Sequence, residues 1–368
     1  MTTVGIIANP ASGKDIRRLV AHGSVFDNNE KVNILRRVLL GLHAIGVEQV
    51  VFMPDYFAIG LKALDGVKQA PSSSLLDMRV RGTQQDSTDA ARLMAEMGVG
   101  CIITLGGDGT NRAVAKTCGD TPLVPISTGT NNVFPFMVES TVAGLAAGIV
   151  AKGIVDAEDV TLPTKRLEVL RDGEVVDIAL VDVVVYDDFF IASRAIWDVS
   201  KVKEIVLSRS EPSNIGFSSV GGGLYCAESN SNHGVYLQLG QGTVEVTAPI
   251  APGLIDRVGI TGFRLLSIGD EVELTYKPSI LALDGEREVE VRGDTRVSVQ
   301  LSDKGPRVVD IGKALHEASK VNFFTSPGAG NEPAETCLIF ESRVCLTPCI
   351  SCLMQTSQTT EGGGQGGS

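Results

Sequence analysis

The stretch that most constrains the fold is a short apolar run that ends in glycines and then continues as a helical pattern. Residues 101–105 predict a buried strand, Gly106-Gly107-Asp108-Gly109-Thr110 predicts a tight loop, and the Ala-rich residues up to Lys116 predict a helix. Parallel α/β proteins place phosphate chemistry at such a junction. The glycines let a ligand approach the main chain closely, and Thr110 is suited to cap the helix.

Asp108 is the residue of this loop whose side chain can take part in a reaction. A lone carboxylate on a loop with exposed amide groups can bind Mg²⁺ or accept a proton from a hydroxyl that attacks a phosphoryl group. An ordinary Gly-rich turn with a solvated Asp has the same sequence. The loop alone therefore leaves both interpretations open, and the other segments decide between them.

Apolar periodicity over residues 1–154 alternates between strands and helices with short connections. This alternation predicts a doubly wound parallel sheet that helices cover on both faces. The helix at 86–97 is expected to begin at a cap formed by Asp86 or Ser87 and to bury Met97. The expected strands are 4–8, 50–53, 75–80, 101–105 and 123–126, and the other expected helices are 30–46, 56–64 and one that runs to 116.

Two further loops of small and polar residues follow the strands at 4–8 and 123–126. The first contains Asn9, Pro10, Ser12, Gly13 and Lys14, and the second contains Thr128, Gly129, Thr130, Asn131 and Asn132. The first is not a Walker A loop, because the glycine four residues before a Gly-Lys pair is absent, and by itself it is also typical of a turn. Because strand ends in a parallel sheet converge on one crevice, we expect both loops and Asp108 to share it.

Near residue 155 the pattern changes to strands rich in β-branched residues, which predict an all-β domain over residues 155–310. Strands at 167–170 and 175–186, joined by an Asp-Gly turn at 172–173, predict a hairpin. Gly221 to Gly223 are expected to form a flexible turn. Asp284-Gly285-Glu286 follows the strand at 280–283 and by itself predicts a solvated hairpin tip.

Charge and cysteine usage exclude several classes of function. The chain of 368 residues carries 44 Asp and Glu against 32 Lys and Arg, and its formal net charge of −12 repels nucleic acid and anionic membrane surfaces. The sequence contains no run of about 18 apolar residues, so no transmembrane helix is expected. The N-terminus lacks the pattern of a signal peptide. Scattered cysteines before residue 330 are typical of a reduced compartment, so we expect a cytoplasmic protein.

Residues 331–368 are rich in Gly, Ser, Thr and Cys and predict a flexible tail. The spacing of Cys345, Cys349 and Cys352 formally matches an iron–sulfur pattern, but no segment after it could house a cluster. A zinc site is left as an alternative, although His233 and His316 lie far from these cysteines in the sequence.

Four segments together resemble one superfamily. The loops at 9–14, 106–110 and 128–132 and the Asp-Gly-Glu turn at 284–286 occur in the order and spacing of the superfamily that joins NAD kinases with diacylglycerol and sphingosine kinases. The resemblance covers residues 1–315. It implies an N-terminal α/β domain, a sandwich-like β domain, a return segment at 311–330 that packs on the first domain, and ATP with Mg²⁺ in the cleft between the domains.

Within this superfamily the sequence combines features of two branches. The segments 249–254 and 179–184 resemble NAD kinase segments, except that Val181 replaces an asparagine and Gly253 replaces a histidine. Thr130-Asn131-Asn132 and the Asp-Gly-Glu turn resemble the lipid kinases. This mixture is similar to the acetoin catabolism protein X group of NAD-kinase-like proteins. The resemblance implies an ATP-dependent kinase that phosphorylates a hydroxyl, with the ribose 2′-hydroxyl of NAD as the expected acceptor.

The resemblance also implies roles for individual residues. Asp108 would accept the hydroxyl proton, directly or through Mg²⁺, and Glu286 would take part in the transfer by orienting metal or water. The residues expected to hold the acceptor are Asp182, Asp284 and Gly285. The residues expected to hold ATP are Asn9, Pro10, Ser12, Gly13, Lys14, Gly106, Gly107, Gly109, Thr110, Asn111, Thr128, Gly129, Thr130, Asn131 and Asn132. A lipid kinase and a catalytically silent nucleotide sensor are the alternatives. A homo-oligomer, either a dimer or a tetramer, is compatible with all three functions.

Overall fold

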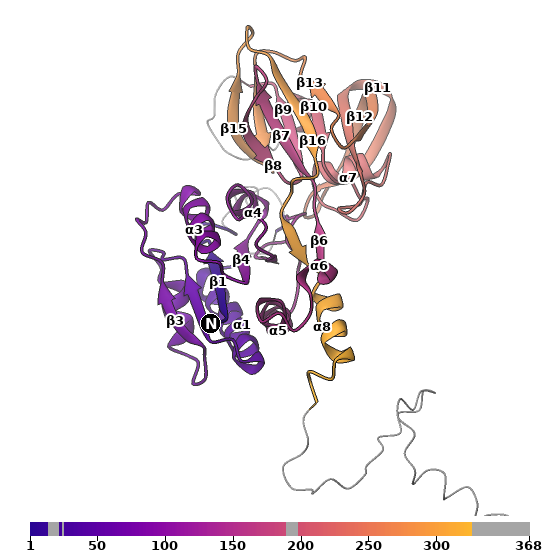
Figure 1. Ribbon diagram of the computed structural model, residues 1–368. Coiled ribbons are helices and arrows are strands. Elements are labelled where there is room, and N and C mark those ends of the chain that lie inside the picture. Colours follow the sequence, from indigo (N-terminus) through magenta and orange to yellow (C-terminus); the bar gives the residue numbers. More distant parts are fainter. Residues whose placement is uncertain (14–21, 24–25, 189–197, 326–368) are drawn as a thin grey trace, which may run out of the picture. The chain divides into compact units, whose positions relative to one another are not determined.

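The computed structural model describes residues 1–13, 22–23, 26–188 and 198–325. In these residues the strands form sheets of seven, six and four strands (Figure 1). The seven-stranded sheet belongs to an α/β lobe and the other two sheets to a β lobe, which confirms the predicted fold class. No helix in this part of the chain is both long enough and apolar enough to span a membrane. Lys14 and residues 331–368, for which expectations are stated above, lie outside the described residues.

The sheet of the α/β lobe has the strand order β3-β2-β1-β4-β5-β17-β6. The first five strands of this order pair in parallel, so their carboxyl ends meet at one edge of the sheet. The strands are β1 (Thr3–Ala8), β2 (Gln49–Phe52), β3 (Ser72–Leu75), β4 (Cys101–Gly106), β5 (Leu123–Ser127), β6 (Thr161–Pro163) and β17 (Arg307–Val309).

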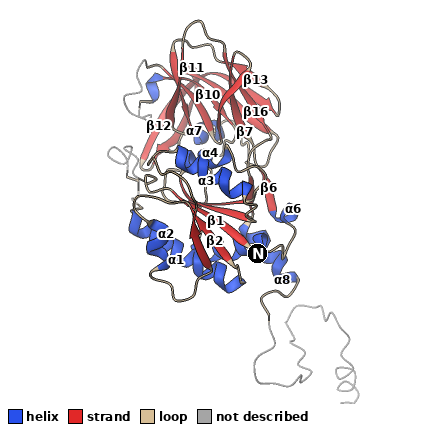
Figure 2. Ribbon diagram, turned by 60° about the vertical axis from the view of Figure 1, so that its left-hand side comes forward, coloured by secondary structure: helices blue, strands red, loops and turns tan. Residues whose placement is uncertain are grey.

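Helices cover both faces of this sheet. Successive strand residues point to opposite faces, and Ile6 packs into the buried cluster that contains Leu35 and Ala146, whereas Ile7 packs into the cluster that contains Met94. The sheet is therefore doubly wound, as predicted, and Figure 2 shows α3 and α4 on the opposite side of the sheet from α1. The helices of this lobe are α1 (Asn28–Ile45), α2 (Ile59–Leu64), α3 (Gln85–Glu96), α4 (Asp108–Ala115), α5 (Ser140–Ala151), α6 (Ala157–Val160) and α8 (Ile311–Lys320).

Three expectations for the region between residues 72 and 97 are wrong. The strand expected at 75–80 is β3 at 72–75, an edge strand whose exposed serines carry no apolar pattern. Asp86 does not cap α3 but lies in its first turn, and its carboxylate accepts the backbone amides of Arg81, Gly82 and Thr83. Met97 follows the helix and is 55% exposed, because it lies one residue beyond the last helical turn.

The β lobe consists of two antiparallel sheets with one core between them. Val183 of the six-stranded sheet and Val299 of the four-stranded sheet belong to the same buried cluster, so the sheets pack face to face as in a sandwich. The strands are β7 (Arg166–Arg171), β8 (Glu174–Ala179), β9 (Asp182–Tyr186), β10 (Val202–Leu207), β11 (His233–Ala251), β12 (Leu254–Ser267), β13 (Glu271–Glu273), β14 (Ser279–Leu283), β15 (Glu286–Val291) and β16 (Val297–Ser302).

Two expectations in the β lobe also need correction. The hairpin at the Asp172-Gly173 turn is present between β7 and β8, but the single strand expected at 175–186 is two strands in different sheets, with the break at Leu180 and Val181. Gly221 and Gly222 end helix α7 (Phe217–Gly222) instead of forming a flexible turn. Both glycines touch Ser210 or Glu211 so closely that no side chain would fit there.

The chain returns to the α/β lobe after the sandwich. β17 pairs with β5 in parallel and with β6 antiparallel. Ile311 and Leu315 of α8 then pack against the buried cluster that contains Ala143 and Ala147 of α5. The connections between the lobes therefore lie next to β6 and β17.

Candidate active site

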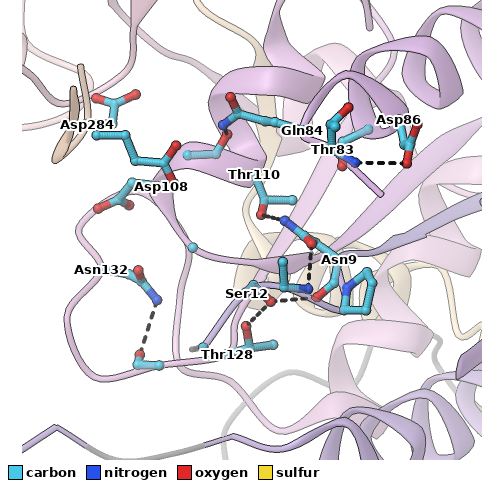
Figure 3. Close-up of a pocket in the computed structure, with 18 of the residues that line it drawn as sticks. Asn9, Ser12, Thr83, Gln84, Asp86, Asp108, Thr110, Thr128, Asn132 and Asp284 are labelled. Atoms are coloured by element: carbon cyan, nitrogen blue, oxygen red, sulfur yellow. Dashed lines mark hydrogen bonds between the residues drawn. The ribbon is translucent and has the colours of Figure 1, made fainter. Parts of the chain in front are cut away.

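One cavity of about 390 Å³ lies at the carboxyl edge of the parallel sheet (Figure 3). The loops that follow β1, β4 and β5 line it together with the turn between β14 and β15. The predicted residues that line it are Asn9, Pro10, Ser12, Gly13, Gly107, Asp108, Gly109, Thr110, Thr128, Gly129, Thr130, Asn131, Asn132, Asp284, Gly285 and Glu286. Segments from both lobes therefore meet at one site. The meeting of the three loops was expected from where the parallel strands end, and the presence of the turn at 284–286 was expected from the family resemblance.

The loop after β1 is held from inside by a lysine that sequence reasoning missed. Lys31 of α1 is fully buried, and its Nζ donates to the carbonyl oxygens of Asn9 at 2.9 Å and Ser12 at 2.6 Å. Lys31 occupies a position that is typical of an ordinary polar residue on a helix, so no sequence signal distinguished it. Because these carbonyl oxygens point toward the Lys31 ammonium, the rest of the loop lies on the side of the cavity.

The loop after β1 also contacts the other two loops. Asn9 Nδ2 donates to Thr110 Oγ1 at 2.9 Å, and the hydroxyls of Ser12 and Thr128 share a hydrogen bond of 3.0 Å. Within the loop after β5, Asn132 Nδ2 donates to Ser127 Oγ at 2.8 Å. The Asn9–Thr110 and Ser12–Thr128 bonds, which Figure 3 marks, join the three loops into one polar wall.

Asp108 is the first residue of α4, with Gly107 in the cap position, so Thr110 is not the helix cap that the sequence suggested. The Thr110 hydroxyl instead accepts the bond from Asn9. The partly buried carboxylate of Asp108 accepts the amides of Phe134 at 2.7 Å and Val133 at 3.0 Å. It is therefore bound to the loop after β5 instead of being freely solvated.

The electrostatic surroundings of Asp108 favour its neutral form. Burial and the nearby carboxylate of Asp284 raise the pKa of Asp108 to about 7, against the opposing effect of the amides and of Arg209. Arg209, a second residue missed in the sequence, is buried with its guanidinium carbon 4.8 Å from the centre of the Phe134 ring. No sequence motif indicated that Arg209 would be buried or that it would contact an aromatic ring.

The turn between β14 and β15 is a tight two-residue hairpin. Asp284 and Gly285 have φ values of 51° and 80°, both in the left-handed region, which is typical of an Asp-Gly turn of type I′. The Asp284 carboxylate accepts the amides of Leu180, Val181 and Asp182, the point where the chain passes from one sheet to the other. Burial raises the pKa of Asp284, and Arg112 opposes this with its Nε 3.9 Å from the carboxylate.

The isolated interpretation of this turn as a solvated tip is therefore wrong, because Asp284 is buried. Its carboxylate is bound to backbone amides, which explains why an acid is required there. Glu286 begins β15 on the other side of the turn. A Cβ added to Gly109 would lie 3.0 Å from Glu286 Oε1, so this carboxyl group reaches across the start of α4 at the one position that has no side chain.

Three predicted residues do not line the cavity, and one lies outside the described residues. Asn111 is buried, with its Oδ1 accepting from Thr104 and its Nδ2 donating to the carbonyl of Gly107. Gly106 ends β4 against the side chain of Thr110. Asp182 is buried at the start of β9, where its amide donates to Asp284. Their effects on the site are indirect. The outlying residue is Lys14.

Gln84 and Arg112 are two more residues that sequence reasoning missed. Gln84 lines the cavity next to the start of α3, and its Nε2 donates to the carbonyl of Gly109 at 2.7 Å. Arg112 of α4 is buried between Gln84 and Asp177 of β8. Gln84 precedes the helix expected at 86–97, and an arginine at a helical position is typical of a solvated helix surface, so the sequence pattern indicated neither residue.

The residues at the site fit a phosphate donor with Mg²⁺. The charged side chains that line the cavity in the described residues are all acidic: Asp55, Asp86, Asp108, Asp284 and Glu286. Mg²⁺ is usually bound by one or two carboxylates together with phosphate oxygens, and in the described residues no group of three His, Cys, Asp or Glu side chains could hold a metal by itself. Asp108, with phosphate oxygens as further ligands, matches that requirement.

Comparisons with known proteins match both lobes. The family model of the ATP-NAD kinase N-terminal domain matches residues 4–154, and that of the acetoin catabolism protein X C-terminal domain matches residues 165–304. The acetoin catabolism protein X of Cupriavidus necator is 39% identical in an alignment of 337 positions that covers 88% of this chain and 94% of that protein. Two structures of a candidate diacylglycerol kinase from Bacillus anthracis str. Sterne align with 13% identity and TM-scores of 0.39, over 83% of this chain and 96% and 97% of theirs.

Proposed function

Because the chain belongs to the acetoin catabolism protein X family and carries an ATP-NAD kinase N-terminal domain, we propose that it transfers the γ-phosphoryl group of ATP to the ribose 2′-hydroxyl of NAD. The observation that carries the proposal is the meeting of three polar loops, Asp108 and Glu286 around one cavity. Phosphoryl transfer asks for positioning and charge neutralisation more than for covalent chemistry by the protein, and this arrangement supplies both.

The phosphates of the donor would lie against the loops after β1, β4 and β5. The amino end of α4 offers a partial positive charge and backbone amides at this place. Gly107 and Gly109 line the cavity without side chains of their own, and the side chain of Asn132 lies over Gly107 while those of Glu286 and Gln84 lie over Gly109. The hydroxyls of Ser12, Thr110 and Thr128 and the amides of Asn131 and Asn132 add neutral hydrogen-bonding groups.

Glu286 is the better placed of the two acids to take the proton of the attacking hydroxyl. The Glu286 carboxyl group reaches over Gly109 at the start of α4 from the opposite lobe, and the Asp108 carboxylate accepts two backbone amides of the loop after β5. The role of Asp108 would then be to hold the loop after β5 and to share a metal with the phosphates. Bound Mg²⁺ would supply the positive charge that neutralises the transferring group, which an acidic cavity by itself does not.

The choice of NAD as the acceptor is supported by the family model at residues 4–154, whose description names ATP and NAD. Asp182 does not line the cavity, so the acceptor would be held around Gly285 and Glu286. We place the protein in the cytoplasm, since Cys101, Cys118 and Cys226 are free thiols. Its partners would be small nucleotides.

A screen for ADP release tests the proposal. The purified chain is incubated with ATP and Mg²⁺ and, in separate reactions, with NAD, NADH, small diols or diacylglycerol in vesicles. The proposal expects ADP and NADP in equal amounts with NAD. ADP release only with vesicles would replace it with a lipid kinase. Tight binding of ATP or NAD by calorimetry without ADP release from any acceptor would replace it with a nucleotide sensor.

A further inference from the structure

Gln84 occupies a position that joins the cavity to the contact between the two lobes. Its side chain lines the cavity (Figure 3), and its Nε2 donates to the carbonyl oxygen of Gly109 at 2.7 Å. Its Oε1 accepts from Arg112 Nη2 at 3.4 Å. The side-chain amide of Gln84 therefore contacts the turn of Gly107 to Thr110 on one side and the buried guanidinium of Arg112 on the other.

Arg112 extends this chain of contacts into the β lobe. Its Nη1 lies 3.4 Å from the carboxylate of Asp177 on β8, and its Nε lies 3.9 Å from that of Asp284. Lys116, which directly follows α4, contacts the same partner with its Nζ 2.6 Å from the Asp177 carboxylate. The contacts run without a gap from the β lobe through Arg112 and Gln84 to Gly109.

Gly109 is also the place where Glu286 reaches α4. A Cβ added there would lie 3.0 Å from Glu286 Oε1 and 3.2 Å from Gln84 Nε2, so both groups lie over the same atom. A shift of the Gly109 carbonyl would change the spacing between the start of α4 and Glu286. Displacements of about 1 Å at such a place cost roughly a hundredfold in rate.

We propose that Gln84 is a positioning residue, which fixes the turn of Gly107 to Thr110 opposite Glu286 and ties that turn through Arg112 to the β lobe. The inference rests on the proposed function for its effect on turnover, but the position of the turn is a property of the protein without substrate. Gln84 acts through Gly109 and Arg112, because both of its amide atoms are engaged with protein groups.

Two variants of Gln84 separate its two contacts. Gln84→Met keeps the length of the side chain and loses both hydrogen bonds. Gln84→Glu loses the donor to Gly109 and keeps an acceptor for Arg112. The matched control is Gln85→Met, since Gln85 is the exposed neighbour whose Nε2 donates to Asp89 at 3.0 Å, away from the cavity.

The test measures kcat and the KM for ATP together with hydrogen exchange of the amides from Gly109 to Ala113 in the protein without ligand. The expected result is a fall in kcat of roughly ten- to hundredfold in both Gln84 variants with KM for ATP changed less than about threefold, faster exchange in both, and no change in Gln85→Met. Wild-type kcat and exchange in Gln84→Glu would overturn the inference, because the Gly109 contact would then be without effect.

The two proposals fail in different ways. If the wild type shows no turnover with any acceptor, the kinase proposal fails, and hydrogen exchange alone decides on Gln84. Faster exchange in Gln84→Met and Gln84→Glu then supports the positioning role, whereas exchange equal to that of the wild type contradicts it.

Discussion

The hydroxyl oxygens of Ser12 and Thr128 lie 3.0 Å apart, although 116 residues separate them in the chain. Each follows a strand of the parallel sheet, and the contact places the loop after β1 against the loop after β5. Asn9 and Thr110 make the corresponding contact with the loop after β4 at 2.9 Å. The three loops therefore form one surface, and several consequences of this arrangement can be measured.

Replacing Asp108 with asparagine should remove turnover by about 10² to 10⁴ with the fold intact. The amides of Val133 and Phe134 both donate to Oδ1 of the carboxylate, so an asparagine oxygen can keep these two bonds but not the charge. Steady-state kinetics with ATP and NAD, together with circular dichroism of the folded variant, measures this. Near-normal turnover would refute the assignment of Asp108.

The same variant should change how stability depends on pH. The pKa of Asp108 is raised from 3.8 to about 7 chiefly by burial, so between these values the folded state holds a proton that the unfolded state has lost. The free energy of unfolding of the wild type must then fall as pH rises through this window, and Asp108→Asn should lack that contribution. Urea unfolding at pH 4 and pH 7.5 should show the variant gaining stability relative to the wild type at the higher pH. A constant difference between the two proteins would contradict the raised pKa.

Replacing Lys31 with methionine should loosen the loop after β1. The partly buried carbonyls of Asn9 and Ser12 would each lose a donor, which costs about 1 to 3 kcal/mol of the free energy of unfolding. Denaturant unfolding measures the loss, and calorimetry with ATP should show weaker binding. The control is Lys62→Met on the exposed face of α2, which should leave both quantities unchanged. Equal affinities for ATP in the Lys31 variant and the wild type would mean that this loop does not hold the donor.

Replacing Gly109 with alanine should impair catalysis more than folding. The new Cβ would lie 3.0 Å from Glu286 Oε1 and 3.2 Å from Gln84 Nε2, and both are ends of flexible side chains that can move by a few tenths of an ångström. The expected result is a fall in kcat of at least about tenfold with a nearly unchanged unfolding midpoint. Gly293→Ala is the control, since a Cβ there would meet nothing within 4 Å. Equal activity of the two variants would show that Glu286 does not need its present position.

The sequence was sufficient for the fold class and for the meeting of the loops, because both follow from strand periodicity and from where parallel strands end. Ser12, Asp108 and Thr128 could be placed together without coordinates for this reason. Glu286 could be added through the family resemblance, since nothing in its own neighbourhood distinguishes it from an exposed hairpin residue.

The remaining residues of the site depend on packing that no local pattern encodes. Lys31 and Arg112 occupy helical positions typical of a solvated surface, and their burial follows from which loop or lobe each helix faces. For Asp284 and Asp182, the sequence pointed to the acceptor, but their contacts in the fold could not be predicted from it. Asp284 has its carboxylate bound to backbone amides at a sheet crossing, and Asp182 starts β9 outside the cavity lining. Whether an acid faces a substrate or its own main chain is decided by tertiary contacts.

The most direct test compares the wild type with Glu286→Gln in the transfer of phosphate from γ-labelled ATP to NAD. Both proteins should bind ATP with similar affinity, because the loops after β1, β4 and β5 are unchanged. Labelled NADP should form with the wild type and should be reduced by about 10² or more with the variant. Equal rates in the two proteins, or labelled phosphate that never appears on NAD, would contradict the assignment of this cavity as the site of transfer.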